Sequence, residues 1–324
     1  MPRELDEDDV RVRPPRSTRP RTKSRPEHAG AAPGTVVTVD RGRYRVQVDD
    51  RIITAVRARE LGRRAVVTGD RVALVGELGG GPDALARVVR VEPRTSLLRR
   101  TPDDTDPVER AVVANAEVLV VVTALADPVP RPRLIDRCLV AAFDGGLTPL
   151  LCLTKSDLAS AEELLALYEP LGVEALVTGR DTGVVELQER LQHKTSVLFG
   201  QSGVGKSTLV NQLVPDAFRA VGEVTGVGKG RHISSSAIAL PLPGGGTVID
   251  TPGVRSFGLG AVTPAGVLAA FPDLAPGAEE CPVGCDHLGS SCALDEWAAE
   301  HGTRPERLES FRRLLRSRDA TDVE

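Results

Sequence analysis

Hydrophobic and polar positions follow two different periods along the chain. Between residues 34 and 94 they alternate, as in Tyr44-Arg-Val-Gln-Val48, and this alternation is typical of half-buried strands. Turn sequences such as Asp40-Arg-Gly42 divide the region into short runs. The runs lie at residues 34–39, 43–49, 51–58, 70–77 and 84–91. Such short strands predict a small barrel, and we expect an OB-fold.

From Pro107 onward, apolar runs alternate with helical patterns. The runs at 117–122 and 148–153 are almost wholly apolar, as expected for strands buried on both faces of a parallel sheet. Leu134, Cys138 and Ala142 recur every four residues and predict a core-facing helix. A second helix is predicted to begin with a capping box of Ser160 and Glu163 and to end at Pro170. The remaining predicted elements are a strand at 173–177 and a helix at 184–191. Together these elements predict a doubly wound α/β sheet with its ligand at the carboxyl ends of the strands.

A buried strand at 197–199 and a helix at 208–213 enclose the pattern G-x-x-x-x-G-K-S. In a phosphate-binding loop of this kind, the glycines let backbone N–H groups turn toward a polyphosphate, and the helix N-terminus adds its dipole. Lys206 is placed to reach the β- and γ-phosphates, and the Ser207 hydroxyl to bind Mg²⁺. The alternative is a glycine-rich turn with a purely structural role. The predicted nucleotide-binding residues of this loop are Gly200, Gln201, Ser202, Gly203, Val204, Gly205, Lys206, Ser207 and Thr208.

Asp250-Thr-Pro-Gly253 follows another short strand, behind a glycine-rich hairpin. In a phosphate-loop nucleotidase an Asp at this strand end supports Mg²⁺, directly or through water. Asp250 is therefore a candidate magnesium ligand with Ser207. Gly253 can bring its N–H onto a γ-phosphate, so Gly253 and Lys206 are candidate catalytic residues.

Thr154-Lys-Ser-Asp157 follows the apolar run at 148–153 and predicts the base reader. The Asp157 carboxylate can accept two hydrogen bonds from the ring N–H and amino group of guanine, a pair that adenine cannot supply. The Lys155 stem would cover the face of the base, and Thr154 belongs to the same nucleotide-binding set. In ordinary GTPases the base reader comes after the phosphate loop. Here it comes first, so we expect a circularly permuted sheet.

The cysteines predict a metal site rather than a disulfide framework, because the chain has five of them and they are unevenly spaced. Cys138 and Cys152 are expected in the core. Three thiols and one imidazole, the ligand set of a closed tetrahedral zinc site, lie within twelve residues at Cys281, Cys285, His287 and Cys292. A closed site is structural rather than catalytic. Free surface thiols in a reducing cytosol are the alternative.

Charge is unevenly placed, although the net charge of −4 gives no bulk attraction to nucleic acid. Residues 1–32 predict a disordered arm whose basic stretch, 11–25, either binds phosphate backbones or is simply solvated. Arginines would also line one face of the barrel, as an RNA-binding surface or a solvated face. They are Arg43, Arg45, Arg51, Arg57 and Arg59. Because Tyr44 is the one aromatic residue among them, contact with RNA backbone or structured RNA is favoured over base stacking.

A last helix has the apolar seam Leu308, Phe311 and Leu315. The arginines around this seam predict an RNA-facing surface, with a solvated helix face as the alternative. They are Arg304, Arg307, Arg312, Arg313, Arg316 and Arg318. The expected parts are therefore the arm at 1–32, the barrel at 33–94, the GTPase domain at 95–255 and a zinc-binding domain at 256–324. The chain shows no signal peptide and no apolar run of membrane-spanning length, so we expect a cytoplasmic protein without membrane contact.

Residues 34–318 resemble the family of circularly permuted, ribosome small-subunit-dependent GTPase A. The resemblance rests on the phosphate loop, Gly230-Arg-His232, Asp250-Thr-Pro-Gly-Val-Arg-Ser-Phe-Gly258, the permuted order and the Cys₃His cluster. It implies an OB-fold, a permuted GTPase and a zinc domain that act in late maturation of the small ribosomal subunit, which stimulates GTP hydrolysis. The implied partners are the small subunit with its rRNA and GTP or GDP, and the implied cofactors are Mg²⁺ with GTP and one structural zinc. We expect a monomer.

Two positions depart from the pattern of that family. Thr154 stands where the family has Asn, which removes one amide contact to guanine. Ile233 stands in a segment where the family has threonines, and an isoleucine cannot ligate Mg²⁺. Ser234 and Ser235 are the remaining candidates for that role.

The sequence predicts a GTPase that binds the small ribosomal subunit and uses hydrolysis to time its own release. Val254 stands where many GTPases place a water-orienting Gln, so His232 is the nearest candidate for this task, unless it only packs against its loop. One alternative function is an ATP-using phosphate-loop enzyme, against which Asp157 argues. The other is a non-enzymatic RNA-binding assembly factor whose nucleotide site only regulates binding.

Overall fold

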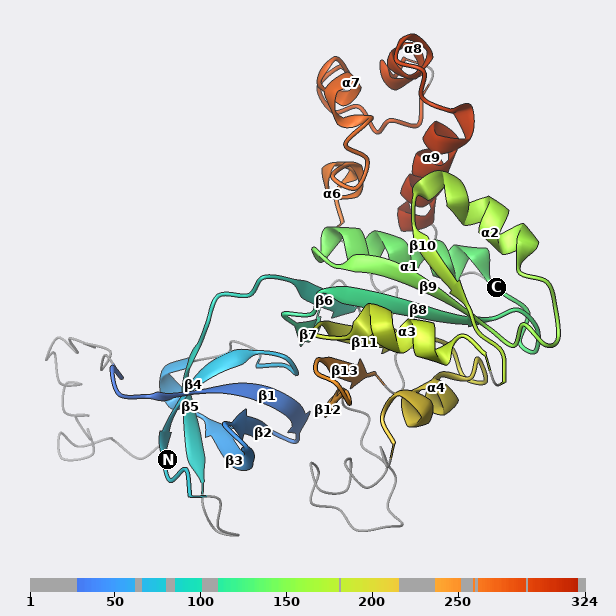
Figure 1. Ribbon diagram of the computed structural model, residues 1–324. Helices are drawn as coiled ribbons and strands as arrows, with labels where there is room; N and C mark the ends of the chain where they lie inside the picture. Colours follow the sequence, from blue (N-terminus) through green and yellow to red (C-terminus); the bar gives the residue numbers. More distant parts are fainter. Residues whose placement is uncertain are drawn as a thin grey trace, which may run out of the picture.

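The computed structural model (Figure 1) describes residues 28–61, 66–79, 85–100, 110–180, 182–215, 237–251, 259, 262–289 and 291–319. Most of the predicted arm lies outside these ranges, as do His232, Ser234, Ser235 and Gly253. None of the helices in the described part combines the length and the apolarity that a membrane crossing requires.

The N-terminal strands form a closed barrel. They are β1 (Ala32–Asp40), β2 (Arg43–Val48), β3 (Arg51–Arg57), β4 (Arg71–Gly76) and β5 (Ala86–Val91). Their order is β1-β2-β3-β5-β4, and an additional pairing of β1 with β4 closes the barrel, as the OB-fold prediction requires. Alternate side chains such as Val36, Val46 and Val88 fill its interior and are fully buried. Tyr44 is also in this core, 6% exposed, so its ring cannot stack on a base.

The central sheet is doubly wound and permuted, as predicted. Its strands are β8 (Val118–Ala124), β9 (Thr148–Thr154), β10 (Glu174–Val177), β11 (Thr195–Phe199), β12 (Ile238–Pro241) and β13 (Thr247–Asp250). They lie in the order β10-β9-β8-β11-β13-β12, and all neighbours are parallel except β12 with β13. The helices around them are α1 (Pro132–Asp144), α2 (Glu162–Tyr168), α3 (Val184–Leu191) and α4 (Lys206–Leu213). Figure 1 shows α1 on one side of the sheet and α3 on the other.

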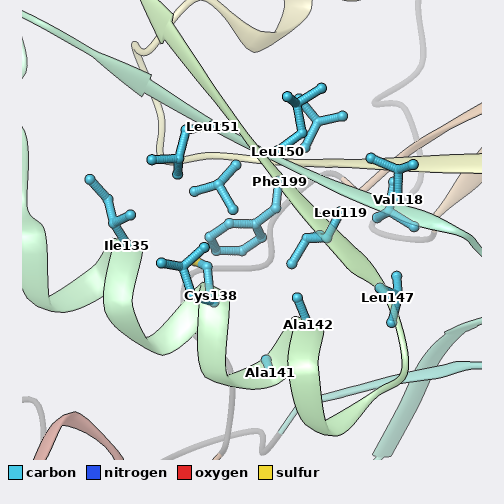
Figure 2. Close-up of a cluster of buried hydrophobic side chains, with 14 of the residues drawn as sticks. Val118, Leu119, Ile135, Cys138, Ala141, Ala142, Leu147, Leu150, Leu151 and Phe199 are labelled. Carbon is cyan, nitrogen blue, oxygen red and sulfur yellow. The ribbon is translucent and has the colours of Figure 1, made fainter. Parts of the chain in front are cut away.

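The sheet and α1 share a buried apolar layer, shown in Figure 2. Leu119, Leu151 and Phe199, one from each of β8, β9 and β11, pack toward Ile135 and Cys138 of the helix. All five are at most 2% exposed, and burying a large apolar side chain such as Leu119, Leu151 or Phe199 stabilises the fold by about 1.5–3 kcal/mol. The layer holds three strand ends in fixed relative positions.

The predicted capping box at Ser160 and Glu163 is wrong. The Ser160 hydroxyl accepts the N–H of Glu162 at 3.2 Å, but α2 begins at Glu162 with Ala161 as its N-cap residue. Glu163 is consequently one position too close to the helix start for the reciprocal bond of a capping box.

A hairpin that the sequence pattern did not predict connects the barrel to the central sheet. It consists of β6 (Leu97–Arg100) and β7 (Arg110–Ala114), which pair antiparallel. Behind β7, the Asn115 amide donates to the carbonyl of Gly69 at 2.9 Å. A Cβ at Gly69 would lie 2.1 Å from the Ala114 carbonyl oxygen, and φ there is +86°, so this close approach requires glycine.

The barrel and the central sheet also pair directly. Thr38 of β1 lies opposite Ile238 of β12, which makes one continuous sheet of eleven strands. The Thr68 hydroxyl donates to the Ala237 carbonyl at 3.0 Å beside this contact. The edge strand of the GTPase sheet is thereby covered by the barrel.

The C-terminal part consists of short helices and a longer last helix. They are α6 (Pro264–Leu268), α7 (Ala275–Glu279), α8 (Leu294–Glu300) and α9 (Pro305–Asp319). The predicted seam of α9 is confirmed, since Leu308, Phe311 and Leu315 are buried. Phe311 lies edge-on to Phe271 at 5.0 Å between ring centroids. The helix therefore packs between its own module and α1.

Three of the six arginines that the sequence predicted to face RNA form ion pairs with other parts of the chain, whereas Arg304 and Arg316 are more than half exposed. Arg307 pairs with Asp273 at 2.8 Å, and Arg313 pairs with Asp136 of α1 at 3.1 Å. Arg312 pairs with Asp295 at 2.7 Å. These three cations connect the helix to the rest of the chain, and the role of the other arginines toward RNA stays a prediction.

We predict that Arg313→Met lowers the free energy of unfolding by about 3 kcal/mol, because it leaves a buried carboxylate without its cation. The Asp136 side chain is 3% exposed, and its burial raises its pKa although Arg313 opposes the shift. The loss should be larger at alkaline than at acidic pH. In the variant, the pKa of Asp136 in the folded state rises further above its value in the unfolded chain. The free energy of unfolding therefore falls as the pH rises from the unfolded-state pKa to the folded-state pKa.

Urea denaturation followed by the fluorescence of Trp297, the single tryptophan of the chain, measures this effect. The matched control is Arg316→Met on the same helix, whose partner Glu309 is 62% exposed, and we expect it to cost less than about 1 kcal/mol. Equal losses in the two variants would contradict the prediction.

Candidate functional site

The phosphate loop lies between β11 and α4. The helix begins at Lys206 rather than at the predicted Thr208, with Gly205 as its N-cap at φ +90°. No side chain among the described residues caps this end of α4, so its first N–H groups remain available to an anion. A Cβ at Gly200 would lie 2.6 Å from the Val122 carbonyl oxygen. Gly203 has φ +85°, and the backbone path therefore explains why these positions are glycines.

The predicted phosphate and magnesium residues meet across the strand ends. The Lys206 ammonium donates to the Asp250 carboxylate and forms an ion pair with it. Leu198 lies opposite Asp250 in the parallel ladder of β11 and β13. The neighbouring Thr251 hydroxyl donates to the Leu198 carbonyl at 2.7 Å and is buried. The end of β13 is thus attached to the strand that carries the phosphate loop.

Thr154 connects the base reader to the phosphate loop. Its hydroxyl lies 2.6 Å from the Val204 carbonyl oxygen and 3.3 Å from that of Thr123. A hydroxyl has one proton to donate, and the shorter contact is the better hydrogen bond. This single side chain, 5% exposed, joins elements that are fifty residues apart in the sequence.

Two loops that the sequence analysis gave no role surround the base reader. The Lys155 ammonium donates to the Asp127 carbonyl, in the segment that follows β8. The N–H of Ser156 donates to the Thr178 carbonyl at 3.2 Å. A Cβ at Gly179 would approach the Ser156 hydroxyl to 3.0 Å. Both segments directly follow apolar strands, β8 and β10, whose carboxyl ends lie at the same edge of the sheet. This position after an apolar strand is the feature of the sequence from which their role could have been predicted.

Asp157, the predicted guanine ligand, is exposed at this edge. Ser202, Gly203, Ser207 and Thr208 are also exposed there. The carboxylate and the phosphate loop thus lie at the carboxyl ends of two parallel strands, β9 and β11, with β8 between them, at the edge where doubly wound sheets bind nucleotides. The structure therefore places the residues predicted to read the base and those predicted to bind the phosphates at the same edge of the sheet.

The Cys₃His cluster lies apart from the nucleotide edge, beside α9. The Sγ atoms of Cys281 and Cys292 are 3.7 Å apart, and each lies 3.6 Å from Nδ1 of His287. Tetrahedral zinc with ordinary bond lengths places two sulfurs about 3.8 Å apart and sulfur and nitrogen about 3.6 Å apart. The four ligand atoms, with that of Cys285, lie within 4.8 Å of one another. The cluster therefore fits a zinc site.

The other two cysteines are buried, as predicted. Burial raises the pKa of the Cys152 thiol to about 11, and that of Cys138 well above its usual range. Neither thiol is available as a thiolate at neutral pH, so neither can act as a nucleophile or a metal ligand.

These environments predict the alkylation pattern of the native protein. With zinc bound, iodoacetamide should modify none of the five thiols rapidly. After chelation it should modify Cys281, Cys285 and Cys292 while Cys138 and Cys152 stay protected until the chain is denatured. Mass spectrometry of peptides and metal analysis, expected to give about one zinc per chain, provide the measurement. Rapid labelling of Cys281 and Cys292 in untreated protein without zinc would contradict the zinc site.

We also predict that Thr154→Val weakens GTP and GDP binding about fivefold, because a buried carbonyl of the phosphate loop loses its partner. Thr154→Ser keeps the hydroxyl and serves as the matched control, with near-normal affinity. Titration with a fluorescent GDP analogue measures both variants. If Thr154→Val binds as tightly as the unaltered protein, the hydrogen bond to Val204 has no part in holding the loop.

Fold and site define a circularly permuted phosphate-loop GTPase. A family model described as RsgA GTPase matches residues 91–260. A protein of Marinobacter nauticus is 39% identical over 271 residues, which are 80% of this chain and 75% of that protein. One of Azotobacter vinelandii is 42% identical over 267 residues, or 78% and 75% of the two chains. Both carry the name small ribosomal subunit biogenesis GTPase RsgA. The chain belongs to the RsgA GTPase family.

Solved structures show the same fold. The crystal structure of YjeQ from Thermotoga maritima superposes with a TM-score of 0.61 at 24% identity, covering 88% of this chain and 97% of that one. The structure of YloQ, described as a circularly permuted GTPase, gives 0.63 at 21% identity, with coverage of 90% and 96%. The permuted order of strands in this chain agrees with that description of YloQ.

Proposed function

We propose that this protein is a GTPase that binds the small ribosomal subunit, acts in its late maturation and leaves it after hydrolysis. The observation that carries the proposal is the bond from Thr154 to Val204, which joins the segment of the predicted base reader to the phosphate loop. The names of the relatives supply the ribosomal subunit as the partner. A protein that acts on maturing ribosomal subunits would be located in the cytoplasm. We also infer that it acts as a monomer.

The chain's own residues divide the work on the nucleotide. Asp157 accepts the two N–H groups that distinguish guanine, and Lys155 covers the base. The free N–H groups at the start of α4 bind the phosphates, together with Lys206. Ser207 and Asp250 would hold Mg²⁺, which neutralises charge on the β- and γ-phosphates when bound. In the arrangement described here Lys206 pairs with Asp250, so this ion pair must loosen when phosphates compete for the lysine.

Contact with the subunit is assigned to the barrel rather than to α9. Arg43, Arg51 and Arg59 are exposed on it, whereas Arg307, Arg312 and Arg313 of α9 are directed to carboxylates of the same chain. Since Tyr44 is buried, the barrel would bind RNA through phosphates and shape. The zinc would be structural, because its four protein ligands leave no open position.

The test of base choice is Asp157→Asn. The amide cannot accept the guanine pair but matches the carbonyl of xanthine, so GTP affinity should fall about tenfold or more while binding of xanthosine triphosphate improves. The control is Glu162→Gln, which removes an exposed carboxylate nearby on α2. Unchanged preference for GTP in Asp157→Asn would show that another group reads the base.

The test of catalysis is GTP turnover measured with and without purified small subunits. Because Val254 cannot orient a water, we expect slow intrinsic hydrolysis and a strong acceleration by subunits. His232→Ala should abolish most of the acceleration while GTP binding and subunit binding stay near normal. His193→Ala, an exposed histidine at the opposite end of β11, is the control.

Each result decides a different question. Full subunit-stimulated turnover in His232→Ala removes this histidine from the reaction. Loss of nucleotide affinity in the same variant makes it a structural residue. Absence of acceleration by subunits in the unaltered protein would leave a nucleotide-regulated RNA-binding factor instead of the proposed GTPase.

A further inference from the structure

Arg312 of α9 contacts the zinc cluster from outside its ligand set. Its Nε donates to the carbonyl oxygen of His287 at 3.0 Å. Its two terminal nitrogens donate to the two carboxylate oxygens of Asp295 at 2.8 and 2.7 Å. The Arg312 side chain is 14% exposed, against 50% for Asp295. Each nitrogen of the planar guanidinium has a partner, so its orientation is fixed.

The residue that Arg312 contacts has an unusual backbone. His287 has φ +61°, a left-handed conformation that residues other than glycine seldom adopt without support. Its N–H donates to Sγ of Cys285 at 3.4 Å, and its carbonyl accepts from Arg312. This conformation turns Nδ1 toward the sulfurs of Cys281 and Cys292. The bond from Arg312 therefore holds the ligand's peptide in the geometry that metal binding needs.

Charge gives Arg312 a second reason to lie here. Three thiolates and one imidazole around Zn²⁺ carry a net negative charge, and a shielded cation beside them stabilises it more than an exposed one would. The ring of Phe311, the preceding residue of α9, packs at 6.1 Å from the His287 ring. Two successive residues of α9 thus support the same ligand.

We propose that Arg312 is a positioning residue of the zinc site. Its guanidinium fixes the His287 peptide and compensates the charge of the thiolates, and Asp295 holds the guanidinium in the required orientation. The inference rests on the proposed zinc site but not on GTP hydrolysis. It makes α9 part of the metal site as well as the helix that packs on α1.

The experiment measures zinc release from the full-length, zinc-loaded protein into an excess of a chromophoric chelator. Arg312→Gln should release zinc about tenfold faster or more, the usual effect of removing an outer-shell partner. Arg312→Lys keeps the charge but not the planar fork, and it should restore part of the retention. Asp295→Asn should accelerate release less than Arg312→Gln. Arg316→Gln, which breaks an exposed pair on the same helix, should match the unaltered protein.

Cobalt substitution gives an independent readout, because the sulfur-to-cobalt charge-transfer bands respond to hydrogen bonding and charge at the thiolates. These bands should shift in Arg312→Gln and not in Arg316→Gln. Unchanged release in Arg312→Gln, or equal acceleration in Arg312→Gln and Arg316→Gln, would overturn the proposal while leaving the zinc site intact. If Arg312→Gln does not fold, unchanged release in both Asp295→Asn and Arg312→Lys would overturn it. An unaltered protein that purifies without zinc would instead refute the zinc site itself.

Discussion

The parallel pairing of β8 with β11 is the contact on which the rest of the structure depends. Four residues of each strand lie in register, from Ser196 opposite Val118 to Phe199 opposite Val121. The base reader at the end of β9 precedes the phosphate loop after β11, and about fifty residues separate them in the sequence. Only β8 lies between them in the sheet. The ladder therefore sets the distance that lets Thr154 reach Val204.

The same sheet carries the barrel on its far edge. Since β12 is the last strand of the GTPase sheet, its outer backbone groups would be open to other chains if β1 did not lie beside them. β12 pairs with β13 along four residue pairs, and β13 ends at Asp250, which holds Lys206. A displacement of the barrel by a bound partner would therefore act on the strand that carries the proposed magnesium ligand. Ordinary sheet hydrogen bonding is sufficient for this connection.

Much of this arrangement could be predicted from sequence because it rests on local pattern. The alternating runs of the barrel, the apolar strands and the spacing of Cys281 to Cys292 each determine a local geometry. The hairpin of β6 and β7 was missed because its apolar face is short and its partners, such as Gly69, are distant in sequence. The roles of Asp127 and Gly179 were missed because they come from loops that meet only when the sheet forms. The sequence pattern also placed the N-cap of α2 at Ser160, whereas the N-cap residue in the structure is Ala161.

Arg307, Arg312 and Arg313 of α9 show why charge alone does not identify an RNA-binding surface, since each forms an ion pair with a carboxylate of the same chain. The permutation makes β13 the end of the GTPase core, so the chain must return to the sheet to bury the apolar seam of α9. It does so on α1, and there the acidic partner Asp136 turns a basic helix face into an interface. The rings of His287, Phe311, Phe271 and Phe143 then form a packed row from the zinc cluster to α1. The loop that leads into α1 contains Asp127, which accepts the bond from Lys155. Packed elements couple two sites when they change between discrete positions whose equilibrium both sites affect. Any influence of the zinc cluster on guanine binding would therefore require a displacement of α1 that changes the stability of both sites.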